Sequence, residues 1–110
     1  MNIKIWSLFF LCILTWKQVI AAEKLITLQE FKSHNNAKNC WIIVDAKVYD
    51  VTNLIAIHDT YCEKTKLTDY CGGDASAIWQ EKQKSNNAHK RKSILEFERS
   101  YIGTVLKPSV

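Results

Sequence analysis

An apolar leader leaves so little chain behind it that only one domain can form. Residues 1–4 carry one positive charge, and an apolar run follows from residue 5 to residue 16. Small residues at positions 21 and 22 then supply a signal-peptidase site. We therefore predict a cleaved signal peptide over residues 1–22 and one domain over residues 23–110, with room for a modest core.

Lys17 decides between a cleaved leader and a membrane anchor. It interrupts the apolar run, well short of the roughly 20 residues that a membrane-spanning helix requires. We predict an exported chain, periplasmic or secreted; the alternative is an N-terminal anchor, which would be the chain's only membrane contact. The formal charge of +4 falls to +2 when Lys4 and Lys17 leave with the leader. So small a charge argues against nucleic acid as a partner.

Export places the three remaining cysteines, Cys40, Cys62 and Cys71, in an oxidising compartment where disulfides persist. The short polar loop between Cys62 and Cys71 makes these two the natural pair. Closing that loop would stabilise the fold by roughly 2 to 3 kcal/mol on the chain-entropy model. The alternative is that Cys40 and Cys71 are small buried apolar residues and that Cys62 is a lone surface thiol.

The first half of the domain predicts a short strand, a short helix and a hairpin. Residues 25–26 suit a strand, and Thr27 with Glu30 fits the capping box of a helix. Residues 40–44 and 47–51 are β-rich and are separated by a plausible turn.

The second half is mainly helical. A polar loop without periodicity spans residues 59–70, and a helix of about two turns follows from Ala75. Residues 84–88 form a break, residues 90–100 are again helical, and residues 101–106 suit a closing strand. Short strands that mix irregularly with short helices predict an α+β fold.

Three histidines are the candidates for binding a metal or a cofactor. His34 lies in a polar run at the exposed end of the first helix, so we expect a surface residue. His58 ends an apolar stretch and His89 precedes an amphipathic helix, so either imidazole can be directed into a space between elements. By position alone, each of these also fits an ordinary surface histidine.

Apolar residues flank both of these histidines and are candidate walls for a flat cofactor such as haem. They are Leu54, Ile55 and Ile57 before His58, and Ile78, Trp79, Ile94, Leu95 and Phe97 around His89. The alternative is an ordinary core, because apolar stripes at helical spacing usually pack on each other. Composition alone favours the ordinary core.

Several runs of the sequence resemble the cytochrome b5 family. They are residues 27–31 (TLQEF), 41–52 (WIIVDAKVYDVT), 71–77 (CGGDASA) and 101–103 (YIG). The KVYDVT run at the family's spacing before a histidine is the most specific of them. The resemblance covers residues 25–106 and implies a small mixed sheet with helical hairpins that enclose a haem pocket.

The resemblance implies haem b as cofactor, with iron held between His58 and His89. The residues expected to line the haem are Leu54, Ile57, Ile78, Trp79, Ile94 and Leu95. Two axial imidazoles make the iron six-coordinate and low-spin, so the protein would carry electrons and would not be an enzyme by itself. One departure is that residues 59–61 (DTY) stand where the family usually has Pro-Gly-Gly.

Basic residues gather around His89, where the resemblance would imply a more acidic rim. They are Lys82, Lys84, Lys90, Arg91 and Lys92. We predict a monomer whose redox partner protein presents an acidic docking face, with steering that fades as salt rises. The alternative is a solvated helix face without a partner.

Two other functions remain as alternatives. The fold could act as a binding or interaction module without bis-histidine haem, with Tyr61 or Tyr70 near a cofactor. A zinc site could use His58, His89 and cysteines, although no Cys-x-x-Cys motif or close histidine pair supports it.

Overall fold

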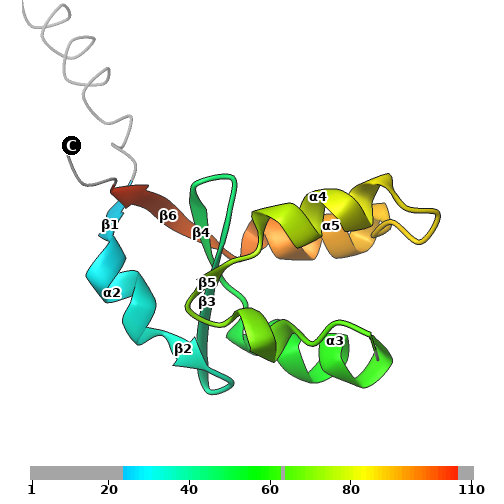
Figure 1. The fold of residues 1–110 in the computed structure, drawn as a ribbon, viewed down its shortest axis with the longest axis horizontal. Coiled ribbons are helices and arrows are strands. Elements are labelled where there is room, and N and C mark those ends of the chain that lie inside the picture. The colour runs from blue at the N-terminus through cyan, green and yellow to red at the C-terminus, as the bar shows by residue number, and fades with distance from the viewer. Residues whose placement is uncertain (1–23, 63, 107–110) are drawn as a thin grey trace, which may run out of the picture.

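The computed structural model describes residues 24–62 and 64–106, so the predicted signal peptide lies outside the described residues. Short strands and helices mix along the chain, as an α+β fold requires (Figure 1). In chain order, with η for a 3-10 helix, the elements are β1 (Leu25–Thr27), α2 (Leu28–Ser33), β2 (Asn35–Asn36), β3 (Asn39–Val44), β4 (Lys47–Asp50), η1 (Thr52–Leu54), α3 (Ile55–Tyr61), η2 (Leu67–Tyr70), β5 (Gly73–Asp74), α4 (Ser76–Lys84), α5 (Arg91–Arg99) and β6 (Tyr101–Leu106).

The strands form one mixed sheet in the order β1-β6-β4-β3-β2, with β5 paired to β3. The predicted hairpin is confirmed, since β3 and β4 pair antiparallel with Ile42 opposite Tyr49. Its turn uses Asp45 and Ala46, both at positive φ, which is the backbone of the two-residue hairpin turn that matches strand twist. The first and last strands, β1 and β6, pair parallel, and β1 forms one edge of the sheet.

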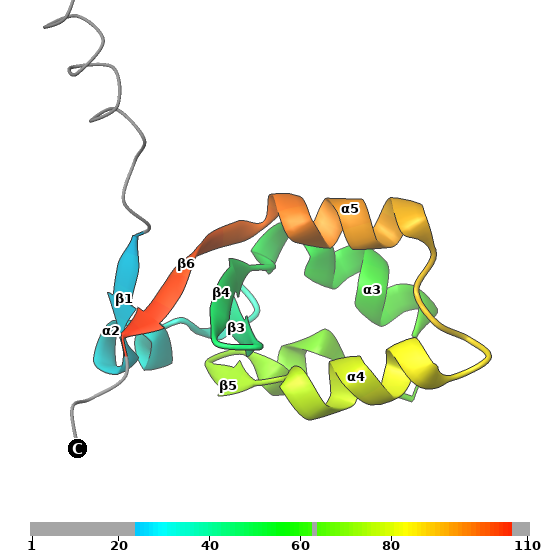
Figure 2. The same cartoon turned by 90° about the horizontal axis from the view of Figure 1, so that it is seen from above.

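Both faces of β3 are buried. Successive side chains of a strand point to opposite sides, so the residues of β3 enter two core clusters. Cys40, Ile42 and Val44 enter one core cluster, which helices α3 to α5 help to form. Trp41 and Ile43 enter a second cluster with Phe31 of α2. Figures 1 and 2 agree with this division: α2 lies at one end of the molecule and α3, α4 and α5 lie at the other.

The predicted loop over residues 59–70 is partly wrong, since α3 continues through His58 to Tyr61 and η2 follows at Leu67–Tyr70. Part of the cause is local, because the Thr60 hydroxyl donates to the Ala56 carbonyl at 2.6 Å. The other part is non-local: the Asp59 carboxylate accepts the Leu67 amide at 2.6 Å. Neither hydrogen bond can be inferred from hydrophobic periodicity, so the sequence predicted a loop here.

The favoured Cys62–Cys71 disulfide is also wrong. Cys71 is bonded to Cys40, with 4.7 Å between their Cα atoms, and Cys62 is a free, half-buried thiol. The cause is strand pairing: β5 runs parallel to β3, and the Gly72 amide donates to the Trp41 carbonyl at 2.7 Å. This pairing brings Cys71 beside a residue 31 positions away. Sequence proximity favoured the wrong partner.

Among the described residues, no helix has both the length and the apolar character to cross a bilayer.

Candidate functional site

His58 lies in α3, and the Nδ1 atom of its ring has a carboxylate partner. Nδ1 lies 3.1 Å from Oδ1 of Asp59. A carboxylate can only accept a hydrogen bond, so the neutral ring carries its proton on Nδ1 and leaves the lone pair of Nε2 available. The His58 side chain keeps 25% of its surface exposed. It is thus a half-buried imidazole ready to bind a metal.

His89 lies between α4 and α5 and has a neutral partner. The side-chain oxygen of Gln83 accepts both the His89 amide, at 3.2 Å, and the ring Nδ1, at 3.0 Å. The ring stacks on Trp79, with 5.0 Å between centroids. Burial, then the charge of Lys82 and then His58 lower the pKa of His89. The imidazole is therefore neutral at neutral pH, which is the form that binds metal.

The two imidazoles lie at a separation that suits one shared metal. Their centroids are 6.4 Å apart and their planes differ by 36°. A metal–nitrogen bond is about 2.0 Å long, so two imidazoles that shared one metal ion would have ring centroids about 6 Å apart. Each Nδ1 already has a partner, so each Nε2 is the free ligand atom. The spacing of the two rings thus leaves room for one metal ion between them.

A zinc site finds no such support. Within residues 24–62 and 64–106, no group of three or more His, Cys, Asp or Glu side chains is placed to hold a metal ion. Structural zinc needs four protein ligands and catalytic zinc needs three. Two imidazoles suit a cofactor that supplies the remaining ligands itself.

Asp59 is the most connected polar residue of the site. Its carboxylate accepts the Leu67 amide at 2.6 Å and the Thr68 amide at 3.3 Å, and it also accepts the Thr68 hydroxyl. Burial by itself raises the pKa of Asp59, but the bonds from Thr68, Leu67 and His58 outweigh it and lower the pKa to about 2. Asp59 is therefore a carboxylate throughout the neutral range.

The predicted haem-lining residues fall into two groups. Leu54, Ile78 and Trp79 pack against the core cluster that contains Phe97. Ile94 is half-buried, whereas Ile57 keeps 66% and Leu95 keeps 41% of their surface exposed. Leu54, Ile78 and Trp79 are therefore packed at the core, and Ile57 and Leu95 lie at the surface.

His34 differs from its prediction as a surface residue. It is half-buried and stacks on Trp41 at 3.4 Å, while its Nδ1 lies 2.5 Å from the side-chain oxygen of Asn39. Trp41 belongs to the cluster on the opposite face of the sheet from the one that contains Trp79. His34 therefore has a structural partner there, on the other face of the sheet.

The sequence alone did not identify Asp59 and Gln83 as the partners of the two ring nitrogens. The departure from Pro-Gly-Gly after His58 was a signal for Asp59, because it put a carboxylate beside the ligand. No sequence signal marked Gln83, since its contact depends on how the segment after α4 folds back.

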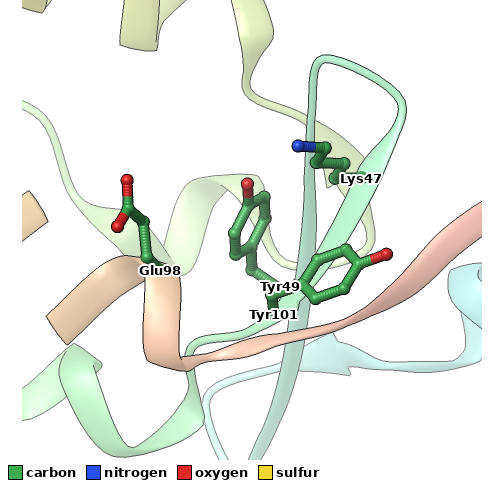
Figure 3. A pocket seen from close by; sticks show the side chains of 4 residues that line it. All are labelled: Lys47, Tyr49, Glu98 and Tyr101. Carbon is green, nitrogen blue, oxygen red and sulfur yellow. The ribbon is translucent and has the colours of Figure 1, made fainter. Parts of the chain in front are cut away.

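An open cavity of about 270 Å³ lies away from the histidines, lined by Lys47, Tyr49, Glu98 and Tyr101 (Figure 3). Tyr49 also stacks on Phe97 at 4.0 Å, and Phe97 lies 4.5 Å from Trp79. Burial, followed by Asp45, Glu98 and Tyr101, raises the pKa of Tyr49. We assign this cavity no ligand.

Comparison with known proteins gives the family of this chain. The family model described as "Cytochrome b5-like Heme/Steroid binding domain" matches residues 27–106. Cytochrome b5 of Nicotiana tabacum is 38% identical over 82 residues, which are 74% of this chain and 55% of that protein. Cytochrome b5 of Bos taurus is 36% identical over 69 residues, 63% of this chain and 50% of that protein. The chain thus spans about half the length of these curated relatives.

Solved structures agree on the fold. Cytochrome b558 of Ectothiorhodospira vacuolata has a TM-score of 0.61 at 24% identity, covering 76% of this chain and 99% of that chain. Cytochrome b5 of Ostreococcus tauri virus 2 has a TM-score of 0.56 at 23% identity, covering 74% and 83%. The predicted α+β fold is confirmed, and haem b, the predicted cofactor, is that of the family. The chain belongs to the cytochrome b5 family.

Proposed function

We propose that this protein is a one-electron carrier in which His58 and His89 hold haem b between them. The observation that carries the proposal is the pair of imidazoles 6.4 Å apart, each with its Nδ1 already hydrogen-bonded. When bound, haem supplies reversible exchange between ferric and ferrous iron.

The residues of the site then account for a carrier with no enzymatic activity of its own. Two axial histidines leave no coordination position for oxygen or a substrate. Asp59 and Gln83 keep a proton on each Nδ1 and fix how each ring is turned. Trp79 stacks on one face of the His89 ring and supports its orientation.

The direct test is an absorption spectrum of the purified domain after addition of hemin. We expect stoichiometric uptake and sharp low-spin bands on reduction. Replacing His58 or His89 singly with Ala should open one coordination position, so that carbon monoxide binds to the ferrous form. His34→Ala is the matched control, because His34 lies in the cluster on the other sheet face and should leave the spectrum unchanged. A folded protein that takes up no hemin would refute the proposal and favour an interaction module.

The basic residues around His89 support an acidic partner. Lys84, Lys90, Arg91 and Lys92 are exposed at the end of α4 and the start of α5, which lie at the end of the molecule opposite α2 (Figure 2). Lys82 is close enough to His89 to lower its pKa. We propose that this basic rim steers a partner with carboxylates on its docking face, through long-range attraction. The predicted monomeric state stays a prediction.

Small charged oxidants test the rim directly. Ferricyanide, an anion, should oxidise the ferrous protein faster at low salt than at high salt, and hexaamminecobalt, a cation, should show the opposite trend. The double variant K90E/R91E should reduce the ferricyanide effect, whereas Lys32→Glu, on exposed α2 at the other end, should not. If both oxidants showed the same salt dependence, the basic rim would not steer charged partners.

We also propose that the chain is exported, either to the periplasm or out of the cell. The Cys40–Cys71 disulfide supports this, because disulfides persist in oxidising compartments. The leader itself lies outside the described residues. Mass spectrometry of the protein from its native cells should show a mature chain that begins near residue 22 or 23. A chain that still begins at residue 1 would instead indicate an N-terminal membrane anchor.

A further inference from the structure

The two imidazoles have unequal partners. Nδ1 of His58 faces the carboxylate of Asp59 at 3.1 Å, whereas Nδ1 of His89 faces the neutral amide of Gln83 at 3.0 Å. The distances are nearly the same, so the difference between the two ligands is one of charge. A charged acceptor makes the stronger hydrogen bond.

We propose that Asp59 is a positioning residue that makes His58 the stronger electron donor of the two axial ligands and so favours ferric over ferrous iron. The inference rests on the proposed haem-binding function. A carboxylate that accepts a ring N–H shifts negative charge toward the imidazole and raises the basicity of the other nitrogen. A more basic Nε2 stabilises the more positive iron, so the reduction potential falls.

Several hydrogen bonds hold the Asp59 carboxylate beside His58. Both of its carboxylate oxygens are occupied: Oδ1 accepts the Leu67 amide as well as His58, and Oδ2 accepts Thr68. Its backbone carbonyl accepts Lys66 Nζ at 2.6 Å. The side chain keeps only 17% of its surface exposed. The carboxylate therefore cannot turn away from His58 without breaking its bonds to Leu67 and Thr68.

The electron count is simple. On reduction one electron passes from the donor protein to the iron, the donor is oxidised by one electron, and no bond at His58 breaks. The Nδ1 proton stays on the imidazole, hydrogen-bonded to Asp59. The carboxylate therefore acts on the equilibrium and does not enter the reaction.

The experiment is a potentiometric titration of the haem-loaded protein and two matched variants. Asp59→Asn keeps the shape of the side chain and removes its charge. Asp69→Asn removes the same charge from the exposed Asp69 of η2, ten positions along the chain. We expect Asp59→Asn to shift the preference toward ferrous iron by about tenfold, equivalent to about 59 mV upward for one electron. Asp69→Asn should shift it far less. Equal shifts in the two variants would overturn the proposal.

A second measurement needs no substitution and covers the case in which Asp59→Asn fails to fold. In the diamagnetic ferrous protein, the Nδ1 proton of His58 should resonate further downfield than that of His89, because its acceptor is charged. The opposite order would overturn the proposal. Equal potential shifts or the opposite order of resonances would overturn only the role of Asp59. If the proposed function itself were wrong, the unsubstituted protein would show no low-spin haem at all.

Discussion

At the scale of single residues, Gln83 positions the His89 ring through one side-chain oxygen that serves two donors. That oxygen accepts both the amide and the ring Nδ1 of His89. Gln83→Leu keeps the size of the side chain and removes the acceptor, so the ring can turn out of position. Loss of such a partner typically costs 10- to 100-fold in metal affinity, and we expect hemin to leave about 10 to 100 times faster.

Transfer of hemin to a haem scavenger measures this rate. Gln29→Leu is the matched control, since Gln29 is exposed on α2, at the other end of the molecule. An unchanged rate for Gln83→Leu would mean that packing on Trp79 alone positions the ring.

At the scale of elements, the Cys40–Cys71 disulfide fastens β5, and the helix that follows it, to β3. The two cysteines are 31 positions apart, and closing a loop of that length contributes roughly 4 kcal/mol on the chain-entropy model. The double variant C40A/C71A should therefore lose roughly this much free energy of unfolding, measured with denaturant. Cys62→Ala is the control: Cys62 is free, so its replacement should leave the stability nearly unchanged. If Cys62→Ala were the costly change, the pairing would be wrong.

Prediction from sequence succeeded and failed for different elements. The β3–β4 hairpin and the break between α4 and α5 were predictable, because strand alternation and loss of periodicity are local signals. The end of α3 at Tyr61 was not, because it depends on side-chain hydrogen bonds that hydrophobic periodicity does not show. The pairing of β5 with β3 was not, because it joins residues distant in the sequence. Asp59 and Cys71 each meet a partner that only the folded chain brings near.

At the scale of the whole molecule, the haem-free chain should lose stability in acid in two steps. The pKa of His89 is lowered in the folded state, so the unfolded chain binds more protons and the free energy of unfolding falls below about pH 6.5. The pKa of Asp59 falls from 3.8 to about 2 on folding. Its contribution is therefore present above pH 3.8 and is lost as the pH approaches 2.

Denaturant titrations between pH 8 and pH 2 measure both steps. Asp59→Asn should abolish the lower step and leave the upper one, whereas Asp69→Asn should leave both. A flat profile from pH 7 to pH 5 would contradict the assignment of a buried, neutral His89.

The sequence by itself determined the β3–β4 hairpin, the helices α2, α4 and α5 and the candidate histidines, because capping boxes, strand alternation and the KVYDVT run are properties of neighbouring residues. Tertiary structure decided what those candidates face. The 6.4 Å between His58 and His89 and the Cys40–Cys71 bond join residues far apart in the sequence, brought together by the packing of helices on one face of the sheet and by strand pairing within it. Asp59 is the sequence neighbour of His58, but the folded segment after α3 holds its carboxylate there through Leu67 and Thr68. Such distances depend on the whole fold, so no local pattern records them.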